Sequence, residues 1–329
     1  MVEEQIAAFW EWWAENRVEL KSAIASGEET DLPTQISELI QEIAPDLEWQ
    51  LTKGSQAAHS FALSAAGNPQ LRVVTEIWLK AAPDADEVWE FHPARQPVEL
   101  APFEEESIKI DPDAAVFETE EDELYEQLVV GVYAPGFESL ALEAQMRAAL
   151  TLLDGTLGED DVERWAGFIE PLEDTPMDPR PLGELRTVVK AFAATATGDK
   201  WEVIEESDKY GLSAITTVNR ALKFIDNVDR NLHLELIIEM EHPDGLGMPE
   251  PEETEVLNAL EDDAFEIFGE AAVFAARETE NGIRRLHFFC WNIPGLDELA
   301  ADWSESITVR KVESELSVDP DWSIASRWA

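Results

Sequence analysis

Five basic residues gather in the last third of the chain: Arg277, Arg284, Arg285, Arg310 and Lys311. Arg284 and Arg285 follow an Asn-Gly pair at positions 281–282, which is typical of a hairpin turn, so the predicted hairpin brings Arg277 close to them. Guanidinium groups bind carboxylates and related anions through paired hydrogen bonds. Arg277, Arg284 and Arg285 are therefore candidate binding residues for an anion or a carboxylate-bearing ligand.

The same cations can also be explained without a ligand. Glu278, Glu280 and Glu313 lie on the same predicted strands, and oppositely charged side chains across two strands stabilise a sheet by about 0.2–1 kcal/mol per pair. Such pairs are common on solvated sheet faces, so we favour this explanation. A ligand site would require a pocket in which Arg277 or Arg285 meets Glu278 or His287.

The single cysteine, Cys290, lies three residues after a histidine in an apolar segment. Side chains alternate between the two faces of a strand, so Leu286, Phe288 and Cys290 share one face and His287 lies on the other. Cys290 and His287 therefore cannot form a catalytic pair with each other. We expect Cys290 to be a buried structural thiol, because free cysteine packs readily as a small apolar side chain.

Motifs for metals, nucleotides and acid–base chemistry do not occur in the sequence. The five histidines show no HxH, HxxxH or HExxH spacing, and neither GxxxxGK[ST] nor GxGxxG is found. Acidic runs such as 104–106 and 118–123 lack the glycine turn of a calcium loop, so we interpret them as solvated charge. Paired carboxylates are too abundant for one catalytic pair to stand out. We predict no catalytic residue, no metal and no cofactor.

Two tryptophans are further candidate binding residues. In the segment FWEWW at 9–13, Trp10 and Trp13 share the apolar stripe of a helix, whereas Trp12 projects from another side. An exposed Trp12 would suit a protein interface, where tryptophan is enriched, although packing in the core is the favoured explanation. The second candidate is Trp322, in the segment DPDWS at 319–323.

The elements that would position these residues follow from periodicity and from turn residues. In the first half, helices are predicted from position 6 to 20 and over 33–43, 69–82, 139–157 and 182–195, with strands over 47–52, 58–64, 88–92, near 116, and over 128–133 and 166–171. In the second half, strands are predicted over 201–205, 212–218, 232–240, 272–276, 286–291 and 308–316, with helices over 252–268 and 295–303. Strands run in consecutive pairs, which favours an α+β fold of two domains, each an antiparallel sheet covered by helices on one face. Ferredoxin-like modules fit this pattern.

A proline-rich segment separates the two halves. Prolines at 171, 176, 179 and 181 favour an extended connector. The helix over 182–195 is expected to pack back on the first half, so the boundary falls at Thr197-Gly198-Asp199. The predicted domains are residues 1–197 and 198–329.

Charge is the dominant property of the chain. It has 329 residues, 71 acidic residues and 23 Lys and Arg, which give a net charge of −48 at pH 7. Such a surface repels phosphate groups, so we expect no binding to nucleic acid or to anionic membranes. Disorder is excluded, because 45% of the residues are hydrophobic and include 12 Trp and 14 Phe.

Other features favour the cytoplasm. One cysteine allows no intrachain disulfide. The first residues are acidic where a signal peptide needs positive charge, and no apolar run approaches the roughly 20 residues of a membrane helix. We therefore expect a cytoplasmic protein. The sequence carries no signature of a particular oligomeric state.

Three explanations of the negative charge remain open. It can serve solubility. It can be an adaptation to a salty cytoplasm, in which screening relieves repulsion. It can also steer a basic protein partner, such as a nuclease or toxin, onto an acidic face.

Several short motifs of the second half occur in a recognisable order: Asp244-Gly245-Leu246, Pro249, Leu260-Glu261-Asp262, Arg277-Glu278-Thr279, Gly282, Arg284-Arg285 and the segment 319–323. In this order they resemble a bacterial family known as domain of unknown function 695, over residues 212–328. The first half resembles an uncharacterised bacterial module through its aromatic opening helix, Ser64 to Gly67, and Leu157-Gly158-Glu159. The resemblance implies a cytosolic bacterial protein with compact α+β domains, and it carries no catalytic residues.

Together these features favour a non-enzymatic protein-binding or inhibitory module whose acidic surface engages a basic protein. The alternative is a hydrolase or small-anion-binding enzyme that uses the region of Arg277, Arg284 and Arg285.

Overall fold

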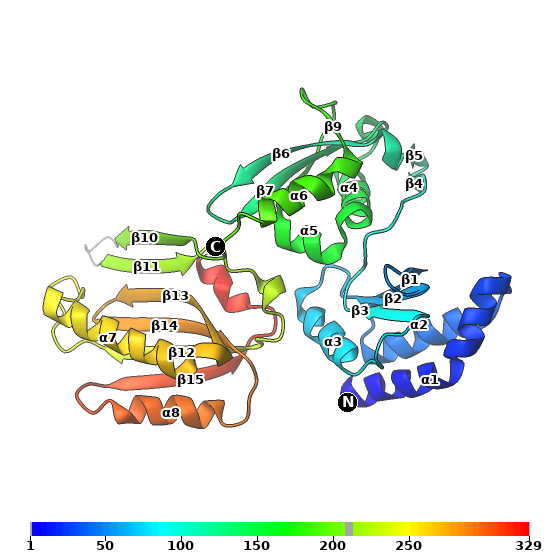
Figure 1. The fold of residues 1–329 in the computed structure, drawn as a ribbon. Helices are drawn as coiled ribbons and strands as arrows, with labels where there is room; N and C mark the ends of the chain where they lie inside the picture. Colours follow the sequence, from blue (N-terminus) through cyan, green and yellow to red (C-terminus); the bar gives the residue numbers. More distant parts are fainter. Residues whose placement is uncertain (1, 208–212, 329) are drawn as a thin grey trace. The chain divides into compact units, whose positions relative to one another are not determined.

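The computed structural model describes residues 2–207 and 213–328. The chain is 41% helix and 28% strand, with several sheets and helices packed beside them, which confirms the predicted α+β class (Figure 1). It divides into two compact units. The N-terminal unit comprises residues 1–121 and 127–195, and the C-terminal unit comprises residues 122–126 and 196–329.

The N-terminal unit begins with an aromatic core beside a three-stranded sheet. Its elements are α1 (Val2–Ser26), α2 (Leu32–Ile43), α3 (Pro69–Lys80), β1 (Glu48–Lys53), β2 (His59–Ser64) and β3 (Trp89–His92). The buried residues of α1 follow the predicted three- and four-residue spacing. Trp13 meets Phe61 of β2 with ring centroids 5.1 Å apart, and the rings of Trp10 and Trp78 of α3 are tilted with centroids 4.7 Å apart.

The rest of this unit has a four-stranded sheet in the order β8-β7-β6-β9. The elements are β4 (Phe103–Glu105), β5 (Ile108–Ile110), η1 (Pro112–Ala114), β6 (Val116–Asp122), β7 (Gln127–Tyr133), η2 (Phe137–Ser139), α4 (Leu142–Leu157), α5 (Glu159–Trp165), β8 (Ala166–Pro171), β9 (Arg180–Pro181), η3 (Leu182–Glu184) and α6 (Leu185–Ala193). Gly158 ends α4 with a φ of +89°, and a Cβ there would lie 2.8 Å from Pro97 Cδ. Glycine is therefore required at this sharp turn between two helices.

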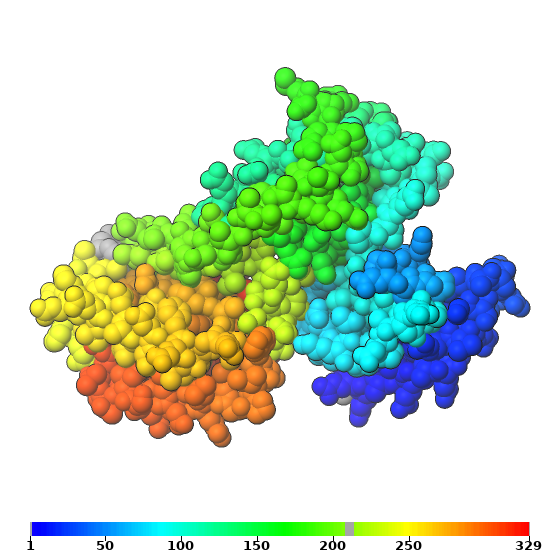
Figure 2. All heavy atoms as spheres, in the orientation of Figure 1, coloured from blue at the N-terminus to red at the C-terminus, as the bar shows by residue number. Residues whose placement is uncertain are grey.

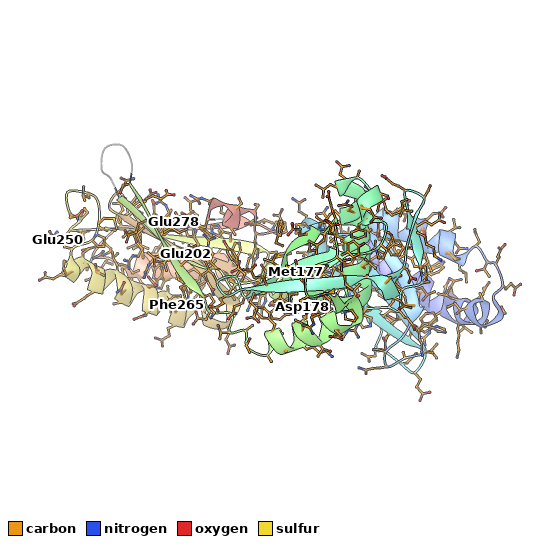
Figure 3. The ribbon with its side chains drawn as sticks, turned by 90° about the horizontal axis from the view of Figure 1, so that it is seen from above. Met177, Asp178, Glu202, Glu250, Phe265 and Glu278 are labelled. Atoms are coloured by element: carbon orange, nitrogen blue, oxygen red, sulfur yellow. The ribbon has the colours of Figure 1, made fainter. Side chains whose placement is uncertain are left out.

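Two of the three sheets of the N-terminal unit differ from the antiparallel sheet that the sequence predicts. In one, β2 and β3 are parallel, and in the other, β7 and β8 are parallel. In each case the strands are joined through helices, which return the chain to the end of the sheet where the first strand began. The second strand can therefore run parallel to the first. The proline-rich segment after β8 leads to β9, which pairs with β6. Met177 and Asp178 are exposed within it (Figure 3).

The C-terminal unit is built on one antiparallel sheet with the strand order β10-β11-β13-β14-β12-β15. Its elements are β10 (Trp201–Ser207), β11 (Ser213–Asn219), η4 (Phe224–Asp226), β12 (Leu232–Glu239), α7 (Pro251–Phe268), η5 (Gly269–Ala271), β13 (Ala272–Glu280), β14 (Ile283–Cys290), α8 (Leu296–Ser306), β15 (Val312–Val318) and η6 (Ser323–Trp328). The predicted antiparallel sheet is present in this half. Position 212 of one predicted strand lies outside the described residues.

The two faces of this sheet have different covers. On one face, α7 and α8 pack over β12 to β15 and form a core with residues such as Leu257, Phe288 and Trp303 (Figure 1). On the other face, the C-terminal turn η6 and the preceding Trp322 cover Phe289 and Val218. Helices therefore pack on one side of the sheet, and the last residues of the chain pack on the other.

The turn 122–126 between β6 and β7 belongs to the C-terminal unit. The carboxylate of Glu126 accepts hydrogen bonds from the backbone N–H groups of Thr197 and Gly198 at 2.7–2.9 Å and from the Thr197 hydroxyl at 2.8 Å. Burial raises the pKa of Glu126, but these hydrogen bonds outweigh it, so the pKa is lowered. Three donors thus bind the ionised carboxylate of Glu126 and attach the turn to residues 197–198.

Candidate functional site

The most unusual polar group of the C-terminal unit lies on the sheet face under the C-terminal turn. It joins Glu278 of β13, His287 of β14 and His233 of β12, which are on three adjacent strands. Leu286, Phe288 and Cys290 lie in the core under the two helices instead. The alternation predicted for this strand is confirmed, because His287 and Cys290 point to opposite faces.

The three side chains form a short relay. His233 Nε2 lies 3.1 Å from His287 Nδ1, and His287 Nε2 lies 3.5 Å from Glu278 Oε2. Glu278 Oε1 accepts a hydrogen bond from Trp328 Nε1 at 2.6 Å, and the Trp328 ring lies 4.8 Å from that of His287. The two imidazoles are within hydrogen-bond distance of each other, and which ring donates depends on the tautomer.

Burial sets the protonation of this relay. It lowers the pKa of His233 to about 4, with a further contribution from repulsion by His287. Burial raises the pKa of Glu278, but hydrogen bonds from His287 and Trp328 outweigh it, so the pKa falls to about 2. At neutral pH Glu278 is therefore ionised and His233 is uncharged.

The relay lacks the nucleophile that a carboxylate–histidine pair serves in hydrolases. Both histidines are buried, and the atom that His287 orients belongs to a second imidazole rather than to a hydroxyl or thiol. Burial raises the pKa of Cys290 to about 12, and its side chain lies on the opposite face. The relay instead attaches the C-terminal turn to the sheet, because Trp328 donates its hydrogen bond to Glu278.

A cleft of about 320 Å³ opens beside the relay. It is lined by Ile204, Glu206, Ala214, Thr216, Glu278, Thr279, Glu280, Arg327 and Trp328. Figure 3 shows Glu278 near Glu202 of the edge strand β10, whose register places it on this same face. Three of the nine residues that line the cleft are glutamates, and Arg327 lines it as well. Arg285 lies opposite Glu278 in the strand register, but neither Arg277 nor Arg285 lines the cleft, so these arginines do not form the pocket that a ligand site would require.

The structure brings two of the three candidate arginines together and separates the third. Arg277 Nη1 lies 3.3 Å from Glu261 of α7, and Arg284 Nη1 lies 3.7 Å from the same carboxylate and donates to Asn258 at 2.8 Å. Burial lowers the pKa of Arg284 to about 10. Arg285 points to the opposite face, because neighbouring residues of a strand alternate.

Carboxylates surround the remaining cations of the cluster as well. Arg285 contacts Glu235 at 3.2 Å and Glu280 at 3.1 Å. Arg310 pairs with Glu253, and Lys311 lies 2.9 Å from Glu239 and 3.2 Å from Glu313. Two of the partners expected from the sequence, Glu280 and Glu313, are present.

Other partners come from elements that strand pairing alone does not suggest. Glu253 and Glu261 are buried in the stripe of α7 that also holds Leu257 and Ala264. Because buried charges are normally paired, two acidic residues on the apolar stripe of a helix indicate that cations lie opposite them. This signal was available in the sequence.

The two candidate tryptophans are both enclosed. Trp12 is partly buried against the aromatic core, and its Nε1 donates to Gln35 Oε1 at 2.9 Å. Trp322 stacks on Phe289 with centroids 3.9 Å apart and donates through Nε1 to the Arg230 carbonyl at 2.8 Å. Both indole N–H groups thus donate hydrogen bonds within the chain.

The N-terminal unit contains a second buried charge network. Arg72 of α3 is buried and binds Asp160, Glu163 at 3.1 Å and the Pro93 carbonyl at 3.2 Å. Burial lowers the pKa of Arg72, but the attraction of these carboxylates outweighs it, so the pKa is raised. Burial raises the pKa of Glu163 despite the nearby guanidinium. The network links α3 to α5 and has the character of a structural ion cluster.

Charge of one sign dominates the outer surface of the two helices on the C-terminal sheet. Exposed acids follow one another along them: Glu252, Glu255, Asp262, Asp263 and Glu266 on α7, and Asp297, Glu298, Asp302 and Glu305 on α8. Neither helix contains a lysine or arginine. We call this set the acidic helical face. Figure 2 shows α7 in yellow and α8 in orange on the surface of this unit.

The described residues contain no group of three or more His, Cys, Asp or Glu side chains placed to hold a metal ion. Within the same residues, no helix is long and apolar enough to cross a membrane.

The buried histidine gives an expected dependence of stability on pH. Because the folded-state pKa of His233 is about 4 and the unfolded value is 6.5, the unfolded chain takes up a proton first as the pH falls. Stability of the C-terminal unit should therefore decrease between pH 6.5 and 4, by about 3 kcal/mol from this group. The groups that act on His233 are His287, Asp319, Arg327 and Glu278.

The measurement is urea unfolding at several pH values for the wild type and for His233→Gln. Subtracting the two curves removes the change in overall acidic repulsion, and the difference should show the loss below pH 6.5. His242→Gln, at an exposed position, serves as the control and should follow the wild type. A flat difference curve for His233→Gln would refute the buried neutral imidazole.

Comparison with known proteins gives one result. Residues 199–325 match the model described as a family of unknown function (DUF695). No curated protein and no solved structure matches the chain. The matched region lies in the C-terminal unit and includes β10 to β15 with α7 and α8. The C-terminal part of the chain is therefore similar to the family that its sequence motifs indicated.

Proposed function

We propose that the protein is a non-enzymatic protein-binding or inhibitory module and that its partner is a basic protein. The observation that carries this proposal is the acidic helical face. Like charges four residues apart, such as Asp262 and Glu266 or Glu298 and Asp302, destabilise a helix by about 0.2–0.5 kcal/mol per pair. A face that keeps these repulsions without a neutralising base is suited to attracting a cationic surface.

The state of the potentially reactive groups also supports a binding role. The His233–His287–Glu278 relay is closed by Trp328, and Cys290 is buried with a raised pKa. An enzyme acting on anions through Arg277, Arg284 and Arg285 would need guanidinium groups free for substrate. Each of these three is instead within 4 Å of a carboxylate of its own chain.

We place the protein in the bacterial cytoplasm, with a domain boundary near residue 198 and with no role in binding nucleic acid. The buried thiol of Cys290 and the net charge of −48 support this placement. The first half is proposed to be a module of the uncharacterised bacterial type that its aromatic opening helix resembles.

The experiment compares two variants of equal charge. One replaces Glu255, Glu266, Glu298 and Asp302 on the acidic helical face by lysine, and the other replaces Glu3, Glu11, Glu15 and Glu19 on α1, which are also exposed. A partner is captured by cross-linking at low salt in the source cells, purified, and titrated against the full chain. The helical-face variant should bind it at least about 10-fold more weakly than the wild type. The α1 variant should stay within about 2-fold.

Equal weakening by both variants would show that net charge alone acts, and would refute the proposal, as would the capture of no protein at low salt. Unfolding in rising salt separates the remaining explanation. A chain adapted to a salty cytoplasm should gain stability steeply towards molar salt, whereas a steering surface requires only that binding weaken.

A further inference from the structure

The helices α7 and α8 do not cover the whole C-terminal sheet. Within residues 213–328 and 196–207, the core beneath α7 and α8 takes its strand residues from β12, β13, β14 and β15 and none from β10 or β11. The register places Trp201, Val203 and Glu205 of β10 on this face, opposite Asn219, Thr217 and Ile215 of β11. The same face continues into Arg277 of β13, opposite Thr217.

Apolar side chains on this part of the face reach solvent. Val203 is 58% exposed, Trp201 is 39% exposed, and Phe265 on the neighbouring edge of α7 is 36% exposed. We call these three residues, with Ile215 of β11 on the same face, the β10–α7 patch. Figure 3 shows Phe265 on the side of the sheet away from Glu278 and Glu202.

The patch is continuous with the core. Phe274 lies 5.4 Å from Trp201 and 4.9 Å from Phe265, measured between ring centroids, and Phe265 also lies 5.8 Å from Phe288. These contacts fix the rings of Trp201 and Phe265 while leaving part of each exposed. Rigid aromatic rings with an exposed edge are favourable anchors for a partner, because little side-chain entropy is lost when they are covered.

Carboxylates flank the patch. Glu205 is exposed two residues from Val203 on the same strand face, and Asp262 is exposed three residues before Phe265, on the same side of α7. Arg277, a cation on the same sheet face, is engaged by Glu261 and lies 3.4 Å from the Thr217 hydroxyl. The surroundings of the patch are therefore negative.

We propose that the β10–α7 patch docks an amphipathic helix of the basic partner. This rests on the proposed function, and it adds the place and the form of recognition. A helix laid beside α7 would complete the layer over the sheet, since helices pack on a sheet as neighbours about 10 Å apart. Its apolar side would cover Val203 and Phe265, and its lysine or arginine residues would meet Glu205 and Asp262.

Charge complementarity decides against a second copy of this chain as the occupant. A symmetric contact through the patch would bring Glu205, Asp262 and the acidic helical face of one copy near those of another. Like charges placed together at an interface cost several kcal/mol. A cationic helix gains from the same groups.

The test uses three peptide probes with the full chain at 0.15 M salt. The first is an 18-residue helix of leucine and lysine with its leucines on one side, the second is a scramble of the same composition, and the third is polylysine of equal charge. The amphipathic helix should bind at least about 10-fold more tightly than either control, because only it presents an apolar side. Hydrogen exchange should slow at residues 201–205 and at Phe265.

Two matched variants locate the site. Val203→Gln should weaken the amphipathic probe about 10-fold by removing an exposed apolar contact. Val318→Gln, which alters an exposed valine on the other edge strand, should leave it unchanged. Neither change alters charge or enters the core.

The outcomes separate this inference from the proposed function. Equal binding of the helix and its scramble would overturn the docking site and leave an acidic surface that binds through charge alone. An unchanged Val203→Gln variant, or protection elsewhere on the chain, would also overturn it. So would concentration-dependent dimers of the wild type that Val203→Gln abolishes. Loss of partner binding in the helical-face variant tests the proposed function independently of these results.

Discussion

Replacing Arg72 by methionine is expected to destabilise the N-terminal unit by about 3 kcal/mol, because the change leaves partly buried carboxylates without their counter-ion. Arg72 binds Asp160 and Glu163 and donates to the Pro93 carbonyl. Nearby Glu159 is itself buried, bonded to the Ser64 hydroxyl at 2.9 Å. Methionine fills similar space, so the loss measures charge rather than volume.

Urea unfolding followed by tryptophan fluorescence measures this loss, since the aromatic core of the unit adjoins α3. Arg72→Lys should recover part of the stability, because one ammonium group cannot reproduce the forked hydrogen bonds of a guanidinium. Arg147→Met is the control, since Arg147 is exposed and pairs with Glu105 at the surface. If the methionine variants at 72 and 147 behaved alike, the buried network would not contribute to stability.

Replacing Trp322 by alanine is expected to destabilise the C-terminal unit by about 3–5 kcal/mol, the usual cost of truncating a buried tryptophan. The indole stacks on Phe289 with centroids 3.9 Å apart and meets Phe224 edge-on with centroids 5.8 Å apart. Its backbone has a φ of +53°, a left-handed conformation that costs of order 1–3 kcal/mol for a residue other than glycine. The packing of the ring offsets this strain.

A graded series distinguishes the contributions of Trp322. Trp322→Phe keeps an aromatic ring against Phe289 but loses the hydrogen bond to the Arg230 carbonyl, and should cost about 1 kcal/mol beyond the change in packing. Trp322→Gly removes the ring but relieves the backbone, and should be less damaging than its lost packing alone implies. Equal stability of the alanine variant and the wild type would mean that the C-terminal turn does not hold the sheet face.

Local patterns in the sequence predicted much of the fold. The helix predicted over 252–268 is α7, and strand alternation correctly placed His287 and Cys290 on opposite faces. The hairpin predicted at Asn281-Gly282 is present between β13 and β14, both longer than expected. These features depend on neighbours within a few residues, which is the range over which periodicity carries information.

Long-range pairing was not predictable in the same way. Glu261 lies 16 residues from Arg277 and 23 from Arg284, and no spacing rule joins an interior helix position to two strands. The relay through His233 crosses three strands whose order follows from topology. The parallel pairs of the N-terminal unit likewise depend on which strands become neighbours after the helices pack, and the three-residue strands β4 and β5 are too short to show a period.

The turn at 122–126 bears on how the gene can be dissected. A fragment trimmed to the family match at 199–325 would omit Glu126 together with Thr197 and Gly198, to which it is bonded. A fragment starting at 196 would keep the two donors but strand them without their carboxylate. The C-terminal half expressed alone therefore lacks part of its own unit. A circularly permuted or co-expressed design that supplies residues 122–126 should fold better in isolation.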